Sequence, residues 1–196
     1  MHRLIIIAAV FTFTAVVAGC GSTPNSRFYS LSAATEPTAP SSNLSIAVGP
    51  VSVPAVVDRP QIVVNVGPNQ VRLEEFNRWA APLQNNIARV VADNLVLMLG
   101  TPRVILSEQL LSADADYRAG IEVQNFQSAL GEAAMLDAVW SVRRVKDGKA
   151  ETGRTTVRET VQDKGYDALA AAHSRALARL SRDIAAAVVA LGRSGQ

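Results

Sequence analysis

The chain has 196 residues with nearly balanced charges, 19 Lys and Arg against 17 Asp and Glu, and a formal net charge of +2. Such a balance, without any run of Lys or Arg, lacks the basic surface by which proteins bind nucleic acid or anionic lipid. Hydrophobic residues make up 48% and aromatic residues only 5%, so we expect one domain with a core built mainly from Val, Leu, Ile and Ala.

The first residues predict a signal peptide at positions 1–19. One fixed positive charge at Arg3 is followed by an apolar run from Leu4 to Val17, broken only by two threonines, and then by small residues. The run, at about 14 residues, is shorter than the ~20 needed to cross a bilayer as a helix. A basic start, an apolar segment of this length and small residues at its end are typical of a secretory signal peptide.

The last residues of this segment and the cysteine after it, Val17 to Cys20, resemble the box that lipoprotein signal peptidase recognises in bacteria. This resemblance implies cleavage before Cys20, a thioether-linked diacylglycerol on its sulfur and an acyl chain on its new amino group. The alternative is an ordinary signal peptide with an incidental cysteine. The only cysteine of an exported chain, however, has no disulfide partner within it. Gly21, where inner-membrane lipoproteins carry an aspartate, resembles the outer-membrane type.

Residues 20–43 are predicted to form the lipidated N-terminus and a tether, because Ser, Thr, Pro, Ala and Asn dominate them and the prolines prevent regular structure. One island of large apolar side chains, Phe28, Tyr29 and Leu31, interrupts this stretch. It predicts either a short edge strand that pins the tether to the domain or a patch that docks a partner.

The domain is predicted over residues 44–192 and opens with a strand at 44–53. The parity of its apolar residues changes at Gly49-Pro50, which indicates a bulge or break there. A hairpin follows, with strands at 61–66 and 71–73. Later strands are expected at 103–106 and 115–130, and a second hairpin pairs 133–145 with 152–161 around the turn residues Asp147-Gly148.

Two helices are predicted from apolar residues at steps of three and four. The first runs from Leu83 to Met98, with Pro82 in its first turn and Gly100 ending it, and the second runs from Tyr166 to Leu191. The order of elements predicts an α/β (α+β) fold: a single two-layer domain with an antiparallel or mixed sheet and both helices packed on one face.

No catalytic arrangement is evident in the sequence. His2 falls within the signal peptide, and His173 lies on the apolar side of the last helix, where a satisfied, partly buried residue is the more common role. The closest acidic pair, Asp114 and Asp116, lacks the glycine-punctuated spacing of a calcium loop. Phosphate-binding loops and serine nucleophile elbows are also missing. We therefore expect a protein that is not an enzyme and carries neither a metal nor a cofactor beyond its lipid.

Several blocks resemble the ABC-type transport auxiliary lipoproteins, a family that includes the lipoprotein of the paraquat-inducible (Pqi) transport system. The blocks are the Phe-Tyr-x-Leu island and residues 46–54, 58–63, 78–83 and 174–181. The resemblance implies an α/β domain with two helices against a sheet. It also implies a periplasm-facing lipoprotein that works beside an MCE-domain (mammalian cell entry) protein and a membrane permease component, which together are thought to move lipids between the two membranes.

In such a system this chain would act by docking, with a ring of identical subunits as one form of assembly. The candidate partner contacts are the island at positions 28, 29 and 31 together with Asp58, Arg59, Arg78 and Trp79. Alternatively, these residues cap strands, form an internal ion pair and bury an indole. Two other functions remain open: a carrier that holds acyl chains between sheet and helices, and an assembly lipoprotein of another envelope machine.

Overall fold

The computed structural model describes residues 24–33, 36, 42–108 and 114–193. The predicted signal peptide and Cys20 lie outside these residues. In chain order the elements are β1 (Arg27–Tyr29), β2 (Ile46–Ser52), β3 (Gln61–Gly67), β4 (Gln70–Trp79), α2 (Leu83–Leu99), β5 (Val104–Leu106), β6 (Tyr117–Ala129), β7 (Ala133–Arg144), β8 (Ala150–Thr160) and α3 (Tyr166–Arg193).

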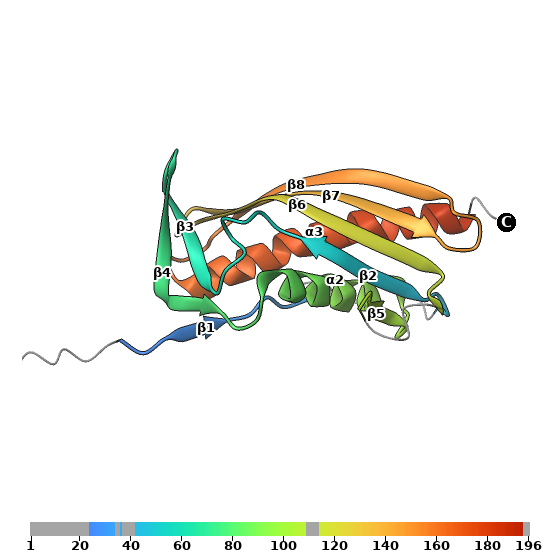
Figure 1. The fold of residues 1–196 in the computed structure, drawn as a ribbon, viewed down its shortest axis with the longest axis horizontal. Helices are drawn as coiled ribbons and strands as arrows, with labels where there is room; N and C mark the ends of the chain where they lie inside the picture. Colours follow the sequence, from blue (N-terminus) through green and yellow to red (C-terminus); the bar gives the residue numbers. More distant parts are fainter. Residues whose placement is uncertain (1–23, 34–35, 37–41, 109–113, 194–196) are drawn as a thin grey trace, which may run out of the picture.

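The predicted α+β class is confirmed, but the strands divide into two sheets. The larger sheet has the order β5-β2-β6-β7-β8, in which β2 is parallel to both of its neighbours and the β6–β7 and β7–β8 pairs are antiparallel. The smaller sheet has the order β1-β4-β3, with β1 parallel to β4. Figure 1 shows the β3–β4 hairpin standing across one end of the long sheet, and both helices on one face of that sheet.

The helices follow the predicted apolar stripes. In α2 the buried side chains include the expected Leu83, Ile87, Val90, Val91, Leu95 and Met98, and Gly100 ends the helix in a left-handed conformation. In α3 the buried side chains include Leu169, His173, Ala176, Leu177, Leu180, Ile184, Val188 and Leu191. These two stripes pack on the sheet and on each other. None of the described helices combines the length and the apolar character that a membrane span requires.

Two local predictions in the strands are confirmed. The register between β2 and β6 shifts between Val48 and Val51, as the change of parity at Gly49-Pro50 predicted. The turn between β7 and β8 contains Gly148 at a φ of 72°, where a residue without a side chain is favoured.

The strand β4 differs from its prediction. It runs over ten residues to Trp79, whereas the sequence indicated a strand only at 71–73. Its side chains are mostly exposed or half-buried, because this hairpin projects from the domain and buries little of its surface. A strand without a buried face shows no apolar alternation by which to recognise it.

Candidate functional site

The apolar island of the N-terminal segment forms β1, an edge strand paired with the end of β4. Phe28 lies opposite Arg78 and Tyr29 opposite Trp79. The backbone N–H of Ala80 also donates to the carbonyl of Tyr29 at 2.8 Å. Tyr29 and Leu31 are buried, whereas Phe28 is 64% exposed. The island therefore forms the edge strand of the first alternative, with Tyr29 and Leu31 fixing it to the domain and Phe28 in solvent.

The segment that carries Asp58 and Arg59 contacts the end of β4 and the first turn of α2 at this end of the domain. The N–H of Trp79 donates to the carbonyl of Pro60 at 2.7 Å, and Gln84 of α2 donates through Nε2 to Asp58 Oδ2 at 3.0 Å. Three blocks that are far apart in the sequence thus meet where β4 ends and α2 begins.

A surface pocket of about 350 Å³ lies at this junction. It is lined by Asp58, Arg59, Pro60, Trp79, Ala80, Ala81, Pro82 and Leu83. Three of the residues predicted to contact a partner, Asp58, Arg59 and Trp79, therefore line one cavity. Phe28 and Arg78 lie opposite each other on the β1–β4 pair and, because side chains alternate along a strand, point to the other face from the buried Tyr29 and Trp79. We call Phe28, Asp58, Arg59 and Arg78, around Trp79, the docking surface.

The indole of Trp79 forms the rigid part of this surface. It is only 5% exposed, and its ring contacts Phe126 and His173 edge-on, each at a centroid distance of 6.3 Å. Phe126 and His173 stack on each other at 3.9 Å. Because aromatic rings in these geometries attract one another and fill the core, the indole is fixed in position.

His173, expected to be partly buried, is fully buried. Its Nε2 is 2.9 Å from the hydroxyl of Ser128, and its Nδ1 has no hydrogen-bond partner. Desolvation lowers the pKa of His173 to about 3, so the ring is neutral at physiological pH. The described residues contain no cluster of three His, Cys, Asp or Glu side chains that could hold a metal ion.

The two arginines of the docking surface differ in their partners. Arg78 donates from Nε to the carbonyl of Glu75 at 2.7 Å, and its guanidinium lies 3.8 Å from the Glu75 carboxylate. This is a surface ion pair, and the described residues show no ion pair among Asp58, Arg59 and Arg78 themselves. The Nε of Arg59, by contrast, is buried without a hydrogen-bond acceptor.

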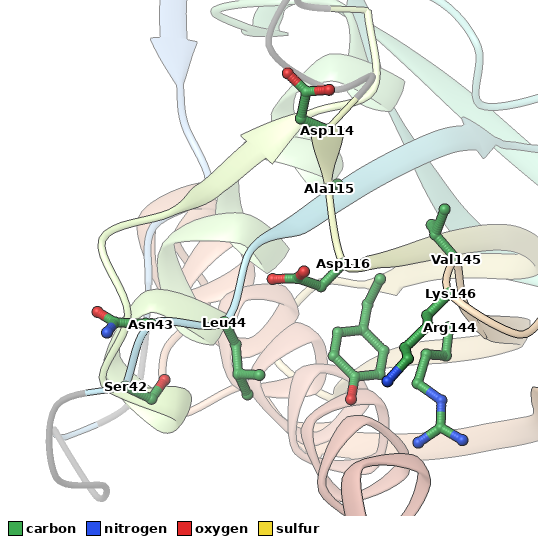
Figure 2. Close-up of a pocket in the computed structure, with 10 residues that line it drawn as sticks. Ser42, Asn43, Leu44, Asp114, Ala115, Asp116, Arg144, Val145 and Lys146 are labelled. Atoms are coloured by element: carbon green, nitrogen blue, oxygen red, sulfur yellow. The ribbon is translucent and has the colours of Figure 1, made fainter. Parts of the chain in front are cut away.

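A larger pocket, of about 660 Å³, is shown in Figure 2. It lies near the starts of β2 and β6 and the end of β7, at the opposite end of the long sheet from the docking surface. The acidic residues Asp114 and Asp116 line it, together with Arg144 and Lys146. Sequence inspection missed this pocket because its lining comes from three separate segments, none of which carries a motif.

Two of the charged groups of this larger pocket, Asp116 and Arg144, have partners within the fold. Asp116 accepts hydrogen bonds from the backbone N–H and the hydroxyl of Ser45, at 2.8 and 2.7 Å. Arg144 donates to Asp147 and to the carbonyl of Leu191, and its guanidinium lowers the pKa of Asp147 to about 2. These bonds tie the start of β2 and the end of α3 to the sheet, which is a structural role.

These features define a mixed-sheet α+β domain with a surface pocket at the end where β4 meets α2. Residues 29–185 match the family described as ABC-type transport auxiliary lipoprotein component, and the chain belongs to this family. The family consists of auxiliary lipoproteins of transport systems. Its membership gives the chain an accessory role and a membrane-anchored place in the cell envelope.

Solved structures show the same fold. A crystal structure of an uncharacterized protein has a TM-score of 0.69 and 21% identity, covering 84% of this chain and 99% of the other. A Xanthomonas campestris protein of the DUF330 family has a TM-score of 0.65 and 19% identity, covering 87% and 100%. A PelC dodecamer from Paraburkholderia phytofirmans, with a TM-score of 0.38, is too dissimilar to inform the oligomeric state of this chain. No curated protein shows a significant match.

Proposed function

We propose that this protein is a non-catalytic docking component of an MCE/ABC-type system that moves lipids between the inner and outer membranes. In this proposal residues 1–19 are removed, Cys20 carries the lipid that anchors the chain to the periplasmic side of the outer membrane, and residues 44–192 form the domain. The domain binds the MCE-domain protein or the permease component of the same system. A ring of identical subunits is compatible with this role.

The observation that carries the proposal is that the candidate residues gather at one end of the domain. Asp58, Arg59 and Trp79 line the pocket at the end of β4, and Phe28 and Arg78 lie on the neighbouring β1–β4 pair at the same end of the domain. Exposed aromatic rings and arginines are both enriched at the energetic centres of protein interfaces.

The position of β1 supports docking close to the membrane. This strand begins at Arg27, about seven residues after Cys20, and a chain of that length spans at most ~25 Å when fully extended. The docking surface includes Phe28 itself, so it would lie within roughly that distance of the bilayer. A lipid anchor at this end keeps the docking surface close to the membrane. A partner protein that bridges the two membranes would have one of its ends there.

The carrier function is less well supported by the packing. The helix side chains that face the sheet, such as Leu95, Leu177 and Ile184, are fully buried. They contribute to one hydrophobic core with the side chains of the sheet. Native mass spectrometry of the lipid-free domain tests this alternative, because bound lipid in stoichiometric amount on each monomer would favour the carrier.

Co-purification tests the docking function. The lipidated protein is purified from detergent-solubilised envelopes after gentle crosslinking, and the MCE-domain protein of the same cells is quantified. We expect enrichment with the unaltered protein, a strong loss with Phe28→Asp, and no loss with Val189→Asp, which places the same charge on an exposed site of α3. Enrichment of the components of another envelope machine, without the MCE-domain protein, would instead identify the protein as an assembly lipoprotein.

A further inference from the structure

The β3–β4 hairpin carries a cluster of exposed apolar side chains. Nine large apolar side chains are exposed among the described residues, and four of them belong to this hairpin: Val66, Val71, Leu73 and Phe76, each between 37% and 45% exposed. A fifth, Val56, lines a small pocket together with Val71. Single exposed apolar residues are ordinary on a protein surface, whereas a group of them marks a site of interaction.

These side chains are exposed because the hairpin projects from the domain. Figure 1 shows its tip standing clear of the long sheet and of both helices. Val71 and Leu73 point to the same side of β4, since side chains alternate along a strand. Val66 lies across the hairpin from Val71, where the register shifts between Asn65 and Gly67. The tip therefore presents apolar surface that the domain does not use for its core.

The tip of the hairpin is also uncharged. Residues 60–71 contain no Asp, Glu, Lys or Arg. The charges further along β4 are paired with one another, Arg72 with Glu74 at 2.6 Å and Arg78 with Glu75 at 3.8 Å. The tip thus offers no charge that a polar partner surface could complement. An uncharged apolar tip, however, can enter the boundary between headgroups and acyl chains without burying a charge there.

The tether before β1 favours a lipid surface as the occupant. β1 begins at Arg27, about seven residues after Cys20, so the chain between them spans at most ~25 Å. Arg27 lies opposite Asn77 of β4, and the strand rises at most ~23 Å from Asn77 to Gln70 at the turn. The tether is therefore long enough to let the tip reach the bilayer that holds Cys20, and short enough to keep the domain beside that bilayer.

We propose that the tip of the β3–β4 hairpin, with Val66, Val71 and Leu73, inserts into the headgroup region of the membrane that anchors the chain. This inference rests on the lipid anchor of the proposed function and adds a second, non-covalent contact with the same membrane. A lipid on a tether limits only how far the domain moves away, whereas a second contact determines which way the domain faces. The docking surface, near the other end of β4, is then held above the membrane.

The hairpin contact does not replace the anchor. A few half-exposed side chains bury too little apolar area to hold a domain on a membrane by themselves. Once the lipid on Cys20 holds the chain there, insertion of the hairpin is intramolecular and takes place at a high effective concentration. A Cys20→Ala protein, which lacks the lipid, should therefore leave the membrane even though its hairpin is intact.

Fluorescence quenching in reconstituted vesicles tests this contact. The lipidated Asn69→Cys protein carries an NBD fluorophore on the exposed turn, and the thioether at Cys20 leaves the new cysteine as the only free thiol. The vesicles contain phosphatidylethanolamine and phosphatidylglycerol, part of it with a nitroxide near the top of the acyl chain. The control is Val189→Cys, near the end of α3 that lies farthest from the hairpin. We expect at least threefold stronger quenching at position 69 than at position 189, and equal quenching would overturn the proposal.

Substitutions in the tip identify the side chains that insert. Val66→Asp and Val71→Asp, added to the labelled Asn69→Cys protein, should reduce the quenching to the level of position 189, because a carboxylate resists transfer into the bilayer. The melting temperature of each variant is measured alongside. If the aspartates lower it by more than a few degrees, Val66→Thr and Val71→Thr keep the shape and the strand propensity, and should reduce the quenching at least twofold. Quenching that neither pair reduces would overturn the proposal.

The outcomes also separate this inference from the proposed function. Protein that does not float with the vesicles lacks the lipid anchor, and both proposals are then wrong. Protein that floats without quenching at position 69 keeps its anchor and loses only the hairpin contact. Quenching at position 69 without binding of the MCE-domain protein supports the hairpin contact and overturns the docking function. A fluorophore that is shielded only after the MCE-domain protein is added would make the hairpin a protein contact, which overturns insertion into the membrane.

Discussion

His173 should make the stability of this domain depend on pH in a window where few other groups titrate. The imidazole is fully buried between Phe126 and Trp79, and Ser128 bonds its Nε2. Desolvation lowers its pKa in the folded protein to about 3, against an ordinary value of 6.5. The folded state therefore requires the neutral ring, whereas the unfolded chain takes up a proton as the pH falls below 6.5.

The magnitude follows from these two pKa values. The contribution of the neutral His173 ring to the free energy of unfolding is fully present above pH 6.5. It declines as the pH falls toward 3 and changes no further below that. Between pH 7.5 and pH 4.5, protonation of His173 stabilises the unfolded chain but not the folded protein. Because pH 4.5 lies about two units below the ordinary pKa of 6.5, the difference is about 3 kcal/mol. That is a large share of the stability of an ordinary domain.

Urea denaturation of the lipid-free Cys20→Ala protein at pH 7.5 and pH 4.5 measures this difference. The comparison is the double variant His173→Phe/Ser128→Ala, which keeps a ring against Phe126 and removes the hydroxyl that would lose its partner. The unaltered protein should lose about 3 kcal/mol more stability than the variant over this interval. Carboxylates affect both proteins equally and cancel. Equal losses in the two proteins would refute the buried, neutral state of His173.

Two further predictions concern packing and anchoring. Gly153→Ala should destabilise the domain by about 1–3 kcal/mol, because a Cβ there would lie 2.7 Å from Cε2 of Trp140 on the neighbouring strand. Gly120→Ala, where a Cβ makes only an ordinary contact with Ser141, should change the thermal unfolding midpoint little, and similar losses for both would show that the Trp140 contact is not the cause. Cys20→Ala should release the protein from membranes with an unchanged circular dichroism spectrum. If this variant still sediments with outer membrane in cells that lack its partners, lipid is not the anchor.

The parts of the fold that were predictable are those in which one face of an element is buried. The stripe from Leu83 to Met98 and the longer one from Leu169 to Leu191 are periodic because each packs against the sheet. The Asp147-Gly148 turn was predictable because its backbone conformation favours glycine. Local chemistry decides these features, so the sequence shows them directly.

The parts that were not predictable depend on contacts between distant segments. The end of β4 lacks an apolar face, so no periodic pattern in the sequence shows how far this strand extends. The division into two sheets follows from the pairing of β4 with β1, which no local pattern indicates either. The candidate residues could be chosen from their blocks, but the meeting of Asp58, Arg59 and Trp79 at one pocket depends on the contact between residues 58–60 and the end of β4. The unsatisfied Nε of Arg59 is likewise a property of its surroundings.

The central claim, that the domain docks through the surface around Trp79, is tested most directly by crosslinking in intact cells. A photoreactive phenylalanine analogue replaces Phe28, which is 64% exposed, and in a second strain replaces Val189, which is 39% exposed on α3. The proposed function predicts a crosslink to the MCE-domain protein from position 28 and none from position 189. A crosslink to that protein from position 189, with none from position 28, would contradict the claim.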